Sequence, residues 1–232
     1  MTKNLSKRIL TSLVLSIILL ICLFLNKYSW LILIIIASTI SFFEFNNLVN
    51  KIWKKNEILK NSINITCFFY LFFFTYSAYE LYKAGLNVTI FILLICIFSD
   101  IGGYVIGKTI GGKKLTKISP NKTISDSIGS LIFSLIPIII FLLIYYFTKN
   151  SEFKIHDYEF PTIYYLCLFT SLMCQLGDLF ISYYKRKAKI KDTGSILPGH
   201  GGLLDRIDGI IFSVPSVIIV DKKSVLGDLI DL

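Results

Sequence analysis

The chain has 232 residues, of which 54% are hydrophobic and 15% aromatic, and its mean hydropathy is +0.69. Such a composition excludes an ordinary soluble domain, and the length allows several bilayer crossings. The net charge of +9 does not indicate nucleic acid binding, because the lysines lie between apolar segments and not along one soluble face. The composition therefore predicts an all-α, polytopic integral membrane protein.

The apolar runs predict about seven transmembrane helices. The first six are long enough to cross the bilayer, whereas the last has about 14 apolar residues, fewer than the roughly 20 that a crossing needs. A signal peptide is the alternative interpretation of the first run, but no small-residue cleavage site follows it, which favours a retained helix. In chain order the runs cover residues 9–25, 28–45, 63–82, 86–106, 128–147, 161–184 and 207–220.

The positive charges predict the orientation. With seven crossings and a cytoplasmic N-terminus, 18 of the 24 Lys and Arg residues fall on the cytoplasmic side, as the positive-inside rule describes. The connectors at residues 108–126 and 185–206 then face the cytoplasm, where nucleotides are. We expect N-terminal helices in residues 1–98 and a catalytic region in residues 99–232. The predicted location is a bacterial-type inner membrane.

Polar side chains recur along the sixth predicted helix. Their spacing of three or four residues places them on one helix face leading to the cytoplasmic surface; they are Ser171, Gln175, Asp178, Ser182 and Lys185. A carboxylate inside a membrane is costly and usually marks a functional site, although a helix–helix hydrogen bond or a protonated Asp would also explain Asp178. The stripe predicts a site at the inner surface.

Asp100 is a second intramembrane carboxylate, near the end of the fourth predicted helix. Gly103, Gly107 and Gly111 follow it at the four-residue spacing that lets helices pack closely, which also suits a homodimer. Residues 102–109, GGYVIGKT, match the P-loop pattern G-x4-G-K-T. That pattern needs a preceding strand and a soluble α/β domain, so we reject a P-loop site here.

The five cysteines lie in apolar runs without CxxC spacing, which favours packing roles over disulfides or a zinc site.

The connector at residues 108–126 contains a predicted helix start, because Thr123 or Ser125 can cap the next helix and Asp126 suits its first turn. Lys122 then lies beside a helix N-terminus, where free N–H groups favour an anion. A phosphate contact and a plain topology-setting charge explain Lys122 equally well.

Residues 182–208, SYYKRKAKIKDTGSILPGHGGLLDRID, carry the most specific pattern. A basic run and a glycine-rich turn precede Asp205, Arg206 and Asp208. Glycines allow close backbone approach to a ligand, and Asp205 and Asp208 are neighbours on a helix that begins near Leu203, as a magnesium site requires. Oxygen ligands without a Cys/His cluster favour magnesium over zinc. The pattern predicts phosphoryl or nucleotidyl transfer on a lipid.

From Gln175 to Asp208 the sequence resembles the signature of the phosphatidate cytidylyltransferase family, the CDP-diacylglycerol synthases. The matching pattern is S-x2-KR-x4-KD-x-G-x2-LPGHGG-x2-DR-x-D. Residues 100–129, with the sequence S-P-x-K-T, resemble the upstream motif of the same family. The resemblance implies that CTP and phosphatidate give CDP-diacylglycerol and pyrophosphate, with membrane lipid but no nucleic acid as partner.

The resemblance also implies roles for individual residues. Asp178, Asp205 and Asp208 are expected to hold Mg²⁺, with room for a second, monovalent cation. His200 would contact a phosphate or protonate pyrophosphate, or else support the glycine turn. The expected catalytic residues are Asp178, Asp205, Lys191, His200 and Arg206. The expected substrate-binding residues are Ser119, Lys122, Thr123, Ser182, Lys185, Arg186, Asp192, Gly201 and Gly202, although Asp192 could instead orient Lys191 or Arg186.

Two other functions compete with this prediction. A CTP-dependent polyprenol or phytol kinase would transfer the γ-phosphate and release CDP. A transporter or lipid-binding scaffold would use intramembrane aspartates to line a pathway, with polar residues spread through the membrane depth. The polar residues of this chain gather at one surface instead, which favours an enzyme.

Overall fold

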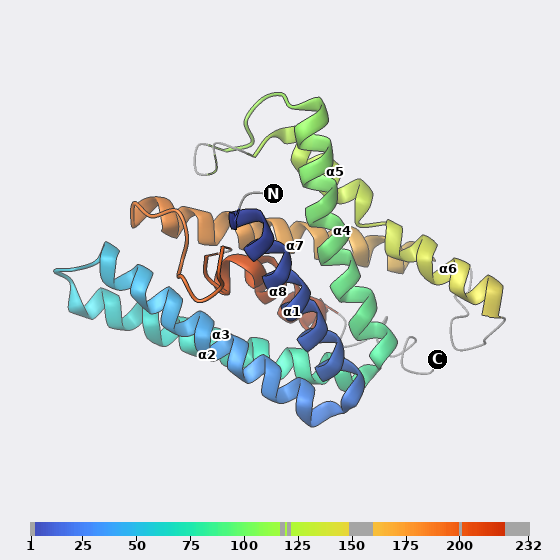
Figure 1. The fold of residues 1–232 in the computed structure, drawn as a ribbon, viewed down its shortest axis with the longest axis horizontal. Helices are drawn as coiled ribbons and strands as arrows, with labels where there is room; N and C mark the ends of the chain where they lie inside the picture. The colour runs from blue at the N-terminus through green and yellow to red at the C-terminus, as the bar shows by residue number, and fades with distance from the viewer. Residues whose placement is uncertain (1–2, 117–118, 120–121, 149–159, 200, 221–232) are drawn as a thin grey trace. The chain divides into compact units, whose positions relative to one another are not determined.

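The computed structural model describes residues 3–116, 119, 122–148, 160–199 and 201–220 (Figure 1). These residues form eight α-helices, and the only β pairing among them is in two isolated bridges, which confirms the predicted all-α class. The chain divides into two compact units, one of residues 1–79 with 180–208 and the other of residues 80–179 with 209–232. The boundary expected at residue 98 stays a prediction.

The first unit contains α1 (Lys3–Leu25), α2 (Lys27–Ile52) and most of α3 (Glu57–Ala84). The side chain of Asn26 caps α2 by accepting hydrogen bonds from the N–H groups of Tyr28 and Ser29, both at 2.9 Å. Helices α2 and α3 lie side by side (Figure 1). Trp30 Nε1 of α2 donates to the carbonyl oxygen of Ala78 in α3 at 3.0 Å, which fixes the two helices to each other.

The second unit contains α4 (Leu86–Ile110), α5 (Ile124–Phe133), α6 (Ile136–Thr148) and most of α7 (Phe160–Lys187) and α8 (Leu204–Val220). We expected one helix over residues 128–147, but the chain breaks between α5 and α6. Pro137 explains the break, because a proline cannot donate to the carbonyl four residues earlier and its ring clashes with that group. That carbonyl belongs to Phe133, the last residue of α5.

The glycines of α4 are used for close packing against α5. A Cβ atom on Gly102 would collide with Gly129 and Phe133, and one on Gly107 would collide with Asp126. This contact lies within the chain and accounts for the small-residue spacing without a second copy. Gly111, with φ of +62°, ends α4 in a conformation that favours glycine.

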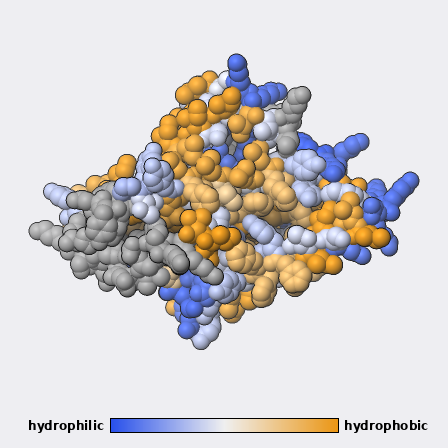
Figure 2. All heavy atoms as spheres, turned by 180° about the vertical axis from the view of Figure 1, so that it is seen from behind, coloured by the Kyte–Doolittle hydropathy of each residue, from blue (hydrophilic) through white to orange (hydrophobic). Residues whose placement is uncertain are grey.

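Six helical segments of the described residues are long and apolar enough to cross a membrane: Ser6–Leu25, Lys27–Ile52, Glu57–Ala84, Leu86–Ile110, Ile124–Ile144 and Pro161–Lys187. The break after α5 therefore leaves the fifth predicted span intact. Hydrophobic side chains cover much of the face in Figure 2, as expected for a surface that contacts lipid. The protein is an integral membrane protein. Helix α8 has only 17 residues, so a seventh crossing stays a prediction.

Candidate active site

An ion pair joins Lys185 at the end of α7 to Asp205 in the first turn of α8. Lys185 Nζ lies 2.8 Å from Asp205 Oδ1, and the side chains are 17% and 8% exposed. The other oxygen, Asp205 Oδ2, accepts hydrogen bonds from the N–H groups of Thr193 at 2.8 Å and Gly202 at 3.2 Å. The Thr193 hydroxyl oxygen lies 3.0 Å from the same oxygen. These donors hold Asp205 in one orientation, shielded from water.

The glycine-rich turn before α8 uses backbone conformations that favour glycine. Gly199 and Gly201 have φ of +79° and +88°. Leu197 and Gly201 exchange backbone hydrogen bonds of 3.0 and 3.2 Å across the turn. A Cβ atom on Gly201 would also collide with the Asp192 side chain. The motif glycines therefore let the loop fold back on itself next to Asp205.

Helix α1 supports the same turn from outside the motif. Arg8 Nε donates to the carbonyl oxygen of Gly199 at 2.8 Å. Thr11 Oγ1 lies 2.9 Å from the carbonyl oxygen of Pro198 and 2.8 Å from that of Lys7 in its own helix. The polar start of α1 thus contacts two carbonyl groups of the turn.

A buried carboxylate from α2 contacts the loop as well. The Glu44 side chain is 3% exposed and accepts hydrogen bonds from the N–H groups of Leu203 at 3.0 Å and Leu204 at 2.9 Å. The Thr193 hydroxyl lies 2.8 Å from Glu44 Oε2 and donates to it. Thr193 therefore lies between two carboxylates, those of Glu44 and Asp205.

A polar cavity of about 600 Å³ opens beside this loop. The C-terminal end of α2 and the connector after it contribute amide and ammonium groups, and the motif loop contributes the rest of the lining. The lining residues are Asn47, Asn50, Lys51, Lys54, Asp192, Thr193, Gly194 and Ser195. The cavity offers cations and hydrogen-bonding groups at one place, which suits an anionic, hydrogen-bonding ligand.

A second lysine–aspartate pair lies in the other unit, where Lys122 forms an ion pair with Asp178 of α7. Asp100 of α4 interacts electrostatically with both charges, and Cys174 Sγ lies 3.8 Å from Asp100 Oδ1. Lys122 is held in place by its own backbone, since its carbonyl oxygen accepts from the N–H of Leu115 at 2.8 Å. Two carboxylates and a lysine thus gather around this face of α7.

The polar stripe predicted for α7 is confirmed as a contact face. Ser171 Oγ lies 2.8 Å from Ser99 Oγ of α4, and Ser127 Oγ of α5 donates to Gln175 Oε1 at 2.6 Å. The structure chooses Thr123 over Ser125 as the cap of α5: Thr123 Oγ1 accepts from the N–H of Asp126 at 3.2 Å. Hence the cap that we expected beside Lys122 is present.

The structure brings four predicted site residues together in two ion pairs that the sequence did not predict, Lys185 with Asp205 and Lys122 with Asp178. Asp178 belongs to one unit, and Asp205 and Asp208 belong to the other. Asp208 and Ser119 are buried at 8% exposure, whereas Arg186, Lys191, Asp192 and Arg206 are exposed. Ser182 lies in α7, and Gly201 and Gly202 lie in the glycine-rich turn before α8. His200 lies outside the described residues.

Sequence reasoning left out Glu44 and Thr193, and it also missed the cavity-lining residues Asn47, Asn50, Lys51, Lys54, Gly194 and Ser195. Glu44 did interrupt an apolar run as its only acidic residue, and an acidic residue inside a membrane segment is a signal of function. Thr193 occupies a variable position of the motif pattern and gave no such signal. Their partnership becomes visible only when residues 149 positions apart meet.

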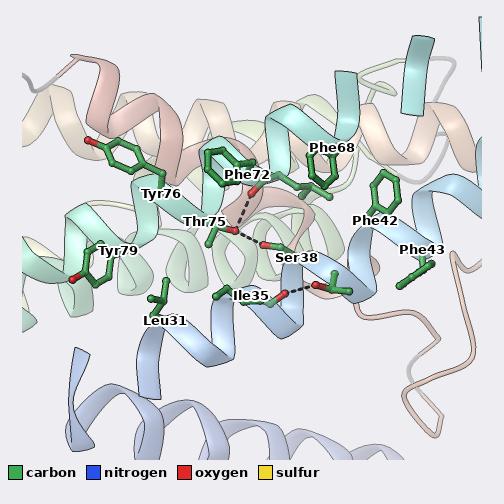
Figure 3. Close-up of a pocket in the computed structure, with 12 residues that line it drawn as sticks. Leu31, Ile35, Ser38, Phe42, Phe43, Phe68, Phe72, Thr75, Tyr76 and Tyr79 are labelled. Carbon is green, nitrogen blue, oxygen red and sulfur yellow. Dashed lines mark hydrogen bonds between the residues drawn. The ribbon is translucent and has the colours of Figure 1, made fainter. Parts of the chain in front are cut away.

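A second hollow, of about 630 Å³, lies between α2 and α3 in the first unit (Figure 3). Aromatic and aliphatic side chains such as Phe42, Phe68 and Phe72 line most of it. Two hydroxyl groups in the hollow, those of Ser38 and Thr75, form a hydrogen bond with 2.8 Å between their oxygens, drawn as a dashed line in Figure 3. The hollow offers no charged group, so its lining suits hydrocarbon and not a nucleotide.

Comparison with known proteins connects these residues to one family. A model of the cytidylyltransferase family matches residues 47–222. A phosphatidate cytidylyltransferase of Rickettsia bellii (strain RML369-C) is 42% identical over 143 residues, 59% of this chain and 59% of the relative. One of Staphylococcus aureus (strain COL) is 41% identical over 138 residues, 59% of this chain and 50% of the relative. The matches thus span about half to three-fifths of these curated relatives.

Proposed function

Because the chain belongs to the cytidylyltransferase family, we propose that it transfers the cytidylyl group of CTP to phosphatidate. A phosphate oxygen of phosphatidate attacks the α-phosphorus of CTP, the bond from that phosphorus to the bridging oxygen breaks, and pyrophosphate leaves. The products are CDP-diacylglycerol and pyrophosphate. The names of the relatives support this reaction, and the matched residues 47–222 include both lysine–aspartate pairs.

The observation that carries the proposal is the Lys185–Asp205 pair with its loop donors. Transfer between two phosphates depends mainly on positioning and on neutralising charge, so it needs no nucleophilic side chain. Asp205 is fixed by Lys185, Thr193 and Gly202. The cations that would neutralise the triphosphate and the lipid phosphate are Lys122, Lys185, Arg186, Lys191 and Arg206.

We propose that the polar cavity beside the loop receives CTP. Lys51 and Lys54 would attract the phosphates, and the Asn47 and Asn50 carboxamides can donate to and accept from a pyrimidine base. The Ser195 hydroxyl lines the same cavity. His200 would contact a phosphate or protonate the departing pyrophosphate.

Magnesium is part of the proposal, and the donors available fit it. Among the described residues no three His, Cys, Asp or Glu side chains gather closely enough to hold a metal by themselves. Magnesium usually binds to one or two carboxylates together with substrate phosphates, so Asp178, Asp205 and Asp208 would hold it only with the nucleotide present. It would supply positive charge on the phosphate oxygens. The proposal allows a second, monovalent cation.

We also propose the membrane orientation. The N-terminus and both motif connectors face the cytoplasm of a bacterial-type inner membrane, supported by 18 of 24 Lys and Arg residues on that side. An impermeant thiol reagent should label Ser195→Cys in inverted vesicles and not in right-side-out vesicles. Labelling only in right-side-out vesicles would show that the motif connectors face the other side of the membrane, and this would refute the proposed orientation. A homodimer stays an untested expectation, because the contact between α4 and α5 already explains the glycine spacing that suggested it.

The reaction is tested with purified protein in vesicles that contain phosphatidate and magnesium, using CTP labelled at the α- or γ-phosphate. We expect α-label in a lipid product and γ-label in pyrophosphate. With polyprenol or phytol supplied, γ-label in lipid and release of CDP would replace our proposal with the kinase. Protein that is folded but consumes no CTP with any of these lipids would favour the transporter or scaffold.

A further inference from the structure

Glu44 is a buried acid that the proposed reaction does not use. It lies in α2, just before the residues 47–222 that the family model matches, and its side chain is 3% exposed. Burying a carboxylate is costly unless hydrogen bonds compensate for the lost water. The partners that compensate Glu44 therefore indicate what it does.

Three donors of the motif loop compensate Glu44. Its Oε1 accepts from the N–H of Leu203, and its Oε2 accepts from the N–H of Leu204 and from the Thr193 hydroxyl, at 2.8 to 3.0 Å. The N–H groups at a helix start have no partner inside the helix, and α8 starts at Leu204. Leu203 precedes it and has no polar side chain to act as a cap. A carboxylate from α2 caps α8 in its place.

Two motif glycines make room for this carboxylate. A Cβ atom on Gly194 would collide with the carboxylate of Glu44, and a Cβ atom on Gly202 would collide with the same group and with Thr193. Neither glycine has a positive φ, so the close approach of Glu44, and not backbone conformation, explains why they are glycines. The loop is therefore shaped around the Glu44 side chain.

We infer that Glu44 is a positioning residue for cytidylyl transfer, an inference that rests on the proposed function. It acts through Thr193, whose hydroxyl contacts Glu44 at 2.8 Å and Asp205 at 3.0 Å, and whose N–H donates to Asp205. By holding Thr193 and the start of α8, Glu44 fixes where Asp205 meets Lys185. Small displacements of charged groups in such a site reduce the rate strongly.

The test compares Glu44→Gln with Glu80→Gln, a matched control. Gln has nearly the size of Glu but only one acceptor oxygen, so its amide nitrogen must face the N–H of Leu203 or of Leu204. Glu80 of α3 is more exposed and pairs with Lys83 at 3.1 Å. Three quantities are measured for each variant: hydrogen exchange of the peptide containing Leu203 and Leu204, the kcat and KM for CTP, and the melting temperature in detergent.

In Glu44→Gln we expect the amide hydrogens of Leu203 and Leu204 to exchange with solvent at least tenfold faster than in the wild type. We expect kcat to fall at least thirtyfold. We expect Glu80→Gln to remain within twofold of the wild type in both. A role limited to stability would lower the melting temperature and leave kcat per folded molecule unchanged, and this result would overturn the inference. So would faster exchange with wild-type kcat, or unchanged exchange.

Thr193→Val supplies a second route if Glu44→Gln does not fold. Valine keeps the shape of threonine and removes the hydroxyl that joins the two carboxylates, so kcat should again fall at least thirtyfold. Thr66→Val on α3, whose hydroxyl donates to the Ser62 carbonyl oxygen of the same helix, is the matched control. Wild-type kcat in Thr193→Val would refute the route through Thr193. Exchange of the loop peptide needs no substrate, so it decides the Glu44 contact even if the wild type makes no CDP-diacylglycerol.

Discussion

Removing the charge of Asp205 should reduce the reaction strongly, because it leaves Lys185 without its partner in a shielded place. At 2.8 Å and an effective dielectric constant of about 20, the two charges attract each other by about 6 kcal/mol. Lost hydration offsets part of this attraction. Truncating one partner of such a pair typically costs about 2 to 5 kcal/mol. We therefore expect Asp205→Asn to lower kcat/KM for CTP by roughly 30- to 5,000-fold.

A double-mutant cycle separates the ion pair from other roles of Asp205. The assay is the initial rate of α-labelled CDP-diacylglycerol formation in vesicles for Asp205→Asn, Lys185→Gln and the double variant. We expect the loss of activation free energy in the double variant to be smaller than the sum of the two single losses, by at least about 1 kcal/mol. The exposed pair Glu80–Lys83 is the control, since removing such a pair has little effect. Single effects that add within about 0.5 kcal/mol would refute the pairing.

Three further substitutions test the local structure. Gly201→Ala should destabilise the protein by at least about 1–2 kcal/mol and reduce turnover, because its φ is +88° and its Cβ would meet Asp192; calorimetry and CTP turnover check this. Thr123→Ala should remove the α5 cap and cost about 1 kcal/mol of stability, measured by thermal melting in detergent; an unchanged melting temperature would contradict the capping role. Lys122→Gln should raise the KM for CTP at least tenfold if Lys122 binds a phosphate, whereas an unchanged KM would leave it only as the partner of Asp178.

The sequence predicted the parts of the molecule that depend on local pattern. Runs of apolar residues located the membrane helices, and the spacing of Ser171, Gln175 and Asp178 placed them on one face of α7, where each meets a polar or charged partner. The neighbouring residues limited the cap of α5 to Thr123 or Ser125, and the structure has Thr123. In each case the signal lies within a few residues, so helical periodicity was enough to interpret it.

The parts that the sequence did not predict depend on single residues or on distant partners. Pro137 stands inside an apolar run that looks continuous, and only its chemistry divides that run into α5 and α6. Glu44 was recognisable as an acid in a membrane helix, but its partners Leu203 and Leu204 are about 160 positions away. Periodicity carries no information about such pairings.

The carboxylates at the start of α8 explain why the proposed CTP site would need many positive charges. Asp205 lies in the first turn and Glu44 caps the same helix start, so two carboxylates already meet the positive end of the helix dipole. Lys185 offsets one of these charges. Little positive potential then remains for a triphosphate and a lipid phosphate, both strongly anionic. The lysines of the α2 end and of the motif, together with a divalent cation, would have to supply it. The same carboxylates that fix the geometry thus create the requirement for cations in the proposed reaction.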